Sequence, residues 1–193
     1  MAYNNAPDYQ VTQYNALSGG ANNTINNIAP GSSGNFLVSN GASSQPTFQI
    51  PTVASIAGFS ATPTGTTSTT YVNMGLGSSW ALTPKTYGNV MISIDGTISS
   101  TTTSVTSTLI LCYGTGAAPG NGTGPTGTTI GLNTIATQSA GSTNYGPTFS
   151  KTYLITSLSP GTAYWFDVQM KISNAADTAA IIGVNFTAQE LIT

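Results

Sequence analysis

The sequence predicts an all-β protein, with a C-terminal antiparallel β-sandwich or jelly roll preceded by an extended N-terminal segment. The 193 residues are rich in β-branched and aromatic side chains, which favour strands. About eight short apolar segments alternate with Gly-, Pro- and Ser/Thr-rich turns, as strands of a two-sheet fold do. No helical period of useful length interrupts them.

The first 58 residues differ from the rest. Their apolar side chains stand singly or in short groups between turn formers such as Asn40-Gly41, so this segment cannot bury much surface by itself. It is either a flexible linker or a segment that packs against copies from other chains. We therefore expect an anchoring or trimerisation segment over 1–58 and a head domain over 59–193. The expected contact residues of the segment are Tyr9, Tyr14, Leu17, Ile25, Ile28, Phe36 and Val38.

Within the head, several segments alternate between apolar and polar residues, which is typical of half-buried strands. Such segments are expected at 90–95, 105–113, 130–135, 153–155, 164–172 and 182–190. In 164–172, Trp165, Asp167, Gln169 and Lys171 form a polar face that we expect to be solvated. In the last strand we expect the inward face to hold Ile182, Val184, Phe186 and Ala188, with Glu190 emerging from the core.

The longest loop candidate is 114–127, with the sequence GTGAAPGNGTGPTG. Loops of this length are uncommon in compact domains, so it is expected to be either functional or disordered.

Composition excludes several functions. Only 4% of residues are charged, against roughly 25% in ordinary soluble domains. The net charge is −2 and Arg is absent, which argues against nucleic-acid binding. Without His there is no Ser-His-Asp or Cys-His arrangement and no imidazole metal site, so we expect no cofactor and no metal. No apolar run reaches the roughly 18 residues of a membrane-spanning helix, so no membrane insertion is expected.

Three residues are candidates for chemistry. Cys112 lies in an apolar run, which favours a buried small hydrophobe over a reactive thiol. Asp95 and Asp167 lie on polar strand faces and could meet across a sheet as a hydrolytic pair. Solvation of both is favoured, because neither has a neighbouring group that would shift its pKa. The protein is therefore not expected to be an enzyme.

Two parts of the chain resemble bacteriophage tail fibres and related virion appendages. The first is 30–49 (PGSSGNFLVSNGASSQPTFQ), and the second runs from 65–77 (GTTSTTYVNMGLG) to 161–168 (GTAYWFDV) and the final Glu190-Leu191. The resemblance implies a homotrimer with a globular C-terminal head, in contact with other virion proteins. It also implies a structural role in the virion, commonly host attachment. Assembly in the host cytoplasm is expected for a different reason, because the first residues show no basic and apolar segments of a secretory signal. The chain is short for a main tail fibre, which leaves a head fibre, decoration protein or short spike open.

Host attachment directs attention to residues that could contact a receptor or glycan. Loops 114–127 and 139–147 are the expected positions, since binding residues concentrate on loops held by a rigid scaffold. The candidate contacts are Tyr113, Asn121, Tyr145 and Trp165. For Trp165 a place in a subunit interface is favoured over stacking on a sugar.

Three alternatives remain open. One is a capsid or tail decoration protein that stabilises the particle, and another is a secreted carbohydrate-binding module. A hydrolase is the third. For the fold, 158–164 (LSPGTAY) is similar to the turn before a strand in fibronectin type III domains, where a Tyr hydroxyl bonds back to upstream backbone. The strand region is too long for such a domain, so the jelly roll is preferred.

Overall fold

The computed structural model describes residues 16–19, 25–41, 43–50, 52–60, 65–100, 105–131 and 148–192. The chain forms two compact units, Met1–Thr52 and Val53–Thr193. The division falls before residue 58, because β5 (Ser55–Ser60) pairs with β13 (Ala179–Glu190) inside the second unit. Tyr9, Tyr14 and Tyr145 lie outside the described residues.

The first unit contains two short antiparallel hairpins. In one, β1 (Ala16–Gly19) pairs with β2 (Ile25–Ile28). In the other, β3 (Phe36–Val38) pairs with β4 (Thr47–Gln49). The side chain of Asn40 ties the loop of this second hairpin, with its Nδ2 atom 2.7 Å from the carbonyl oxygen of Gln45. Each hairpin is a sheet of only two strands.

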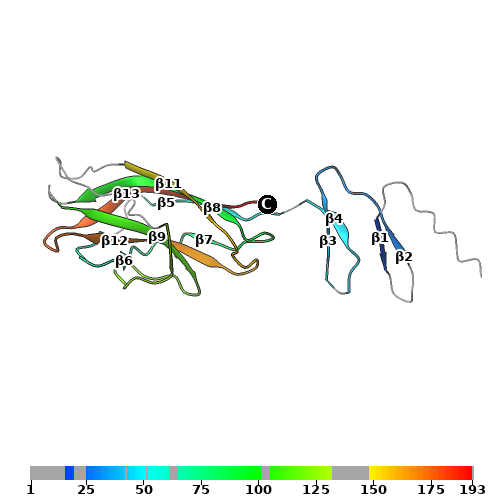
Figure 1. Ribbon diagram of the computed structural model, residues 1–193, viewed down its shortest axis with the longest axis horizontal. Helices are drawn as coiled ribbons and strands as arrows, with labels where there is room; N and C mark the ends of the chain where they lie inside the picture. Colours follow the sequence, from blue (N-terminus) through cyan, green and yellow to red (C-terminus); the bar gives the residue numbers. More distant parts are fainter. Residues whose placement is uncertain are drawn as a thin grey trace, which may run out of the picture. The chain divides into compact units, whose positions relative to one another are not determined.

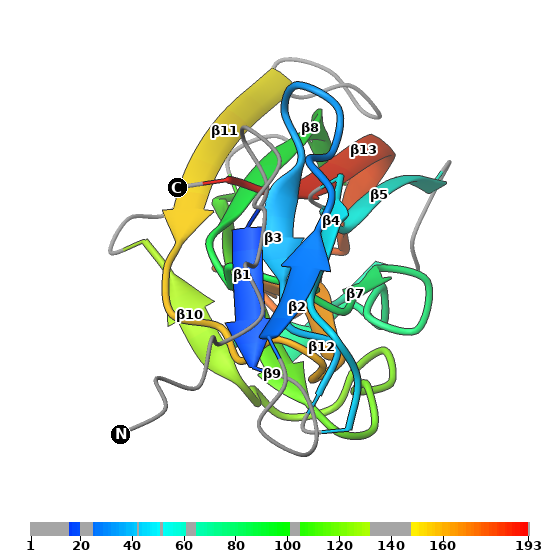
Figure 2. The ribbon, with the colours of Figure 1, turned by 90° about the vertical axis from the view of Figure 1, so that its right-hand side faces the viewer.

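The second unit is a sandwich of two antiparallel sheets (Figure 1). One sheet has the order β11-β8-β13-β5, and the other has the order β10-β9-β12-β6, with β7 also paired to β12. In Figure 2 the first sheet forms the upper layer and the second the lower layer. The remaining strands are β6 (Val72–Asn73), β7 (Ala81–Leu82), β8 (Val90–Ser100), β9 (Ser107–Thr115), β10 (Thr128–Ile130), β11 (Thr148–Ile155) and β12 (Tyr164–Ile172).

The pairing is nested. β9 pairs with β10, β8 with β11, β6 and β7 with β12, and β5 with β13. A long antiparallel hairpin rolled into two layers, one of four strands and one of five, produces this order, which is the double Greek key of a jelly roll. The predicted all-β jelly roll is therefore confirmed, and the fibronectin alternative is not.

One local feature of that alternative is nevertheless present. The backbone N–H of Ser159 donates to the hydroxyl oxygen of Tyr164 at 3.0 Å. This is the Tyr-to-upstream-backbone bond expected from the turn at 158–164, within a sandwich of different topology.

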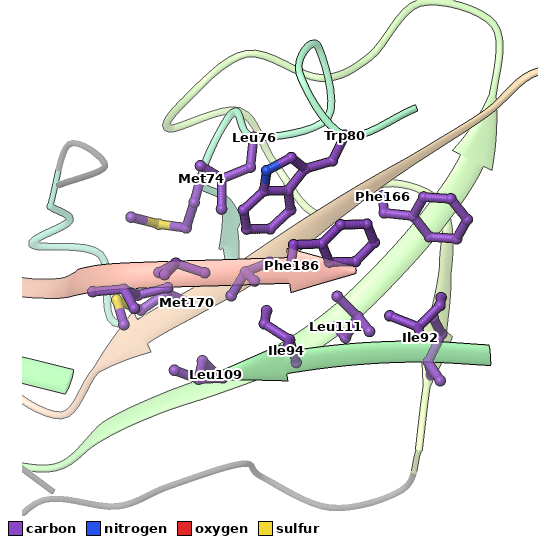
Figure 3. Close-up of a cluster of buried hydrophobic side chains, with 14 of the residues drawn as sticks. Met74, Leu76, Trp80, Ile92, Ile94, Leu109, Leu111, Phe166, Met170 and Phe186 are labelled. Carbon is purple, nitrogen blue, oxygen red and sulfur yellow. The ribbon is translucent and has the colours of Figure 1, made fainter. Parts of the chain in front are cut away.

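The core lies between the sheets, where alternate residues of each strand meet (Figure 3). Trp80 is buried there and stacks on Phe186, with ring centroids 4.6 Å apart and an interplanar angle of 8°. Phe166, from the opposite sheet, completes the aromatic cluster at 5.5 Å from Phe186. The alternation predicted for 90–95 is confirmed, since Val90, Ile92 and Ile94 are buried while Met91 and Asp95 are exposed.

The last strand departs from its predicted alternation at a β-bulge. The register with β8 shifts between Ile182 and Asn185, and Gly183 within the shift has a φ of +60° that favours glycine. Before the bulge Ile181 is the buried residue, and Ile182 is only half-buried. The expectation that Ile182 points inward was therefore wrong, whereas Val184, Phe186 and Ala188 are buried as predicted.

Candidate functional site

The outer face of the β10-β9-β12-β6 sheet is covered, although a solvated polar face was expected there. Trp165 is 6% exposed, and Asp167 and Gln169 are also buried. The cover consists of loop 114–127 together with the segment that follows β6. The long loop is thus ordered, and its glycines let it approach the sheet closely. Lys171 agrees better with the expectation, because it is half-buried with its ammonium 4.7 Å from the centroid of the Tyr71 ring.

Two buried amides fasten the loop to the sheet. The Nδ2 atom of Asn73 donates to the carbonyl oxygen of Gly124 at 2.7 Å and lies 3.2 Å from the hydroxyl of Thr126. The Nε2 atom of Gln169 donates to the carbonyl oxygen of Thr126 at 2.9 Å. Buried polar groups are stable only when hydrogen-bonded, so these contacts explain how two amides are accommodated away from water.

Asp167 is fastened to backbone on the same face. Its Oδ2 atom accepts a bond from the N–H of Gly75 at 3.0 Å, and its Oδ1 atom accepts bonds from Leu76 at 3.0 Å and Val168 at 2.7 Å. Burial raises the pKa of this carboxyl, while the backbone N–H groups partly oppose the rise. The expectation of an unperturbed, solvated Asp167 was therefore wrong, because the cover removes it from water.

Trp165 packs between the sheet and loop 114–127. Its Nε1 atom donates to the carbonyl oxygen of Thr115 at 3.2 Å. A Cβ atom at Gly114 would lie 2.4 Å from Cζ2 of this ring, and one at Gly127 would lie 2.5 Å from Cη2, so both positions require glycine. Most of the indole is consequently enclosed by residues of its own chain.

A shallow groove of about 550 Å³ remains at the edge of this cover. We call it the loop groove; it is lined by Tyr113, Gly114, Thr115, Ala117, Pro119, Thr123, Thr126, Gly127, Thr128 and Trp165. Two of the predicted contact residues, Tyr113 and Trp165, therefore come together there. The ring of Tyr113 nevertheless contacts Tyr164 and Phe166 on the core side, with centroids 6.1 and 6.2 Å apart. Asn121 is exposed on the same loop but does not line the groove.

Glu190 forms a second buried anion site, which the sequence analysis missed. Its side chain is 1% exposed, although it was expected to emerge from the core. Its carboxylate accepts bonds from the consecutive backbone N–H groups of 85–88, at 2.8, 2.8, 2.6 and 3.2 Å, and from Ala54 at 3.0 Å. Burial opposes ionisation, but these N–H groups outweigh it and lower the pKa of Glu190 to about 2.

The remaining candidates for chemistry are not brought together. Asp95 lies on β8 and Asp167 on β12, so the two carboxylates occupy different sheets and form no pair. Cys112 is fully buried as predicted, and burial followed by the charge of Asp167 raises the pKa of its thiol to about 12. Among the described residues, no group of three His, Cys, Asp or Glu side chains could hold a metal ion. That part of the chain also has no helix long and apolar enough to cross a bilayer.

The predicted subunit contacts of the first unit differ in exposure. Ile28 is buried within the described structure, Val38 is half-buried, and Phe36 is 51% exposed. Leu17 and Ile25 lie in β1 and β2, but their side chains are outside the described residues.

Comparisons with known proteins give only distant likenesses. No family model matches the chain, and no curated protein matches it. The chain is similar to the VP2 subviral particle structure of infectious bursal disease virus, with a TM-score of 0.41, 9% identity, and coverage of 80% of this chain and 37% of that chain. It is also similar to the structure of the Gx strain of that virus, with a TM-score of 0.41, 10% identity, and coverage of 90% and 45%. The chain thus spans less than half the length of these structures, and such TM-scores are too low to establish a shared family.

Proposed function

We propose that the protein is a structural component of a virion, fibre- or spike-like, that displays its jelly-roll unit for attachment to a host surface. In this proposal the first unit joins three copies of the chain and anchors them to other virion proteins. The protein would act as part of the particle, after assembly in the host cytoplasm, and without catalysis.

The observation that carries the proposal is the apolar surface of the first unit. Phe36 is 51% exposed, Leu37 48% and Ile50 74%. In its described residues the unit has only two-stranded sheets, which are marginally stable in water by themselves. Its hairpins also leave strand edges with unpaired backbone groups, which favour pairing with other chains. Association with further copies would cover both the side chains and the edges.

Two further points support the role. The double-sheet jelly roll is an architecture common in viral capsid and lectin domains, although this is an argument from fold alone. The segment 30–49, which resembles tail-fibre segments, contains the hairpin that exposes Phe36 and Leu37. The expectation of three chains per particle comes from the same resemblance.

The proposal is tested by the mass of the full chain in solution, measured by light scattering. We expect three chains per particle, and we expect Phe36→Ser combined with Leu37→Ser to reduce that mass. Leu154→Ser is the matched control, since Leu154 is 58% exposed on the second unit and should leave the mass unchanged. A monomeric wild-type protein with a freely moving first unit would overturn the proposal.

Attachment is separated from particle decoration by a second measurement. Fluorescently labelled protein should bind host cells if the jelly roll is adhesive. Absence of binding, with the oligomer intact, would favour decoration instead.

A further inference from the structure

The outer face of the β11-β8-β13-β5 sheet carries a depression that is distinct from the loop groove. Its volume is about 440 Å³, within the range of roughly 300–1,000 Å³ that small-molecule sites occupy. It is lined by Asp95, Gly96, Thr97, Thr148, Phe149, Ser150 and Gly183. Asp95, Thr148 and Ser150 are exposed, so polar groups line an accessible surface.

The β-bulge in β13 builds this site. Ile181 points into the core, and without the extra residue the alternation would also turn Asn185 inward. The shift instead places Asn185 outward and opposite Asp95. Its Nδ2 atom donates to Oδ1 of Asp95 at 2.8 Å, which fixes the orientation of the carboxylate.

The surrounding face is neutral and rich in hydroxyl groups. The cross-strand register puts Ser150 beside Asp95, and Thr148 beside Thr97. On the next row, the hydroxyls of Ser93 and Thr152 lie 3.0 Å apart. The depression and its rim therefore offer several hydrogen-bond donors and acceptors, among which the carboxylate of Asp95 is the single charged group.

We propose that this depression binds a neutral sugar unit of a surface glycan. Asp95 accepts hydrogen bonds from two sugar hydroxyls, Ser150 and Thr148 supply further donors and acceptors, and Asn185 holds the carboxylate in position. A divalent cation is poorly served, because the depression has one carboxylate where such ions take several oxygen ligands. The loop groove is a weaker site for the same ligand, since its indole is enclosed and its N–H is already bonded.

The inference deepens the proposed attachment role and takes its strength from multiple copies. A shallow site with few polar contacts binds one sugar weakly. Several heads on one particle raise the avidity through effective concentration, without any new contact.

The test uses full-length protein on an array of neutral oligosaccharides containing glucose, galactose, mannose or N-acetylglucosamine. Sialylated and sulfated oligosaccharides and immobilised spermidine serve as charged probes. We expect neutral probes to bind, and we expect Asp95→Ala and Asn185→Ala each to lower the apparent affinity at least about tenfold. Ser93→Ala and Thr152→Ala, on the same face but outside the depression, should change it less than about twofold.

Three results would overturn the site: no neutral probe bound, binding that survives both Asp95→Ala and Asn185→Ala, or binding to spermidine alone. Circular dichroism of each variant verifies that the sandwich is intact. Light scattering of the same samples keeps the two proposals separate, because an unchanged oligomer without sugar binding rejects the site and leaves the structural role standing.

Discussion

The two sheets of the jelly roll have outer faces of opposite character. On β12 the outward residues Trp165, Asp167 and Gln169 are buried beneath loop 114–127. On β8 the outward residues Met91 and Asp95 are exposed. Both strands alternate in the same way, so alternation identifies which residues share a face but does not reveal whether that face meets water. The two faces differ because a loop that is distant in sequence covers the one on β12.

The difference also separates two uses of polar residues. On the covered face they accept or donate bonds to backbone and thereby hold the loop in place. On the outer face of the β11-β8-β13-β5 sheet, which we call the bare face, they remain available to solvent or a ligand. Substitution of a polar residue should therefore change the stability strongly beneath the loop and only weakly on the outer face of the other sheet.

The largest expected effect is that of Asp167→Ala. The change leaves the N–H groups of Gly75, Leu76 and Val168 without this acceptor, and buried unpaired donors are costly. We expect a loss of about 3–5 kcal/mol in the free energy of unfolding, measured by urea denaturation. Asp95→Ala on the bare face is the matched control and should cost less than about 0.5 kcal/mol. Equal losses for the two variants would refute the contrast.

The second effect concerns pH and compares the two buried carboxylates. The folded pKa of Glu190 is lowered from 4.5 to about 2, so its stabilisation is complete above pH 4.5 and is lost as the pH falls toward 2. This shift corresponds to about 3 kcal/mol. Asp167 acts in the opposite sense: its folded pKa is raised, so its protonation at low pH favours the folded state.

The measurement is the free energy of unfolding from pH 6 to pH 2. Glu190→Gln should lower stability at pH 6 and flatten the acid limb of the curve. An acid limb that is unchanged in this variant would show that the N–H groups of 85–88 do not hold a carboxylate.

A smaller effect is expected for Asn73→Ala, which removes one of the two amides that fasten loop 114–127. We expect about 1–3 kcal/mol of destabilisation, because the carbonyl oxygen of Gly124 loses its partner. Amide hydrogen exchange in 120–126 should become faster, while exchange in β8 is unchanged. Asn185→Ala is the control on the bare face, and faster exchange there but not in the loop would contradict the assignment.

The smallest effect is that of Thr152→Ala. Its hydroxyl contacts Ser93 on an exposed face, where substitutions usually change stability by less than about 0.5 kcal/mol. Thermal unfolding of this variant should be nearly superimposable on that of the wild type. A loss as large as that of Asn73→Ala would mean that the bare face is also covered.

Much of the fold followed from local patterns. Alternation located β8 and β12, the pairing confirmed a jelly roll, and burial confirmed Cys112 as a buried small hydrophobe. The alternation alone does not reveal the bulge at Gly183, and for this reason the predicted side of Ile182 is wrong. A glycine within a strand pattern is the signal that could have indicated it.

The sites were harder to foresee, because they depend on segments distant in sequence. In the sequence, Asp167 and Glu190 look like solvated acids, because the backbone N–H groups that bind them belong to the distant segments 75–76 and 85–88. The contact of Trp165 with loop 114–127 is of the same kind, because Gly114 and Gly127 approach its ring only once the loop is folded onto the sheet. The sequence does carry one signal of a structural carboxylate: an Asp on a strand face is unusual in a chain that has so few charged residues.

The nested pairing of strands also constrains how the molecule is made. β13 occupies the middle of its layer, between β8 and β5, so both neighbouring ladders form only after this strand, the last of the sandwich in chain order, is available. A nascent chain still short of residue 179 has Trp80 without its stacking partner and two strand edges open, which is a state prone to misassembly.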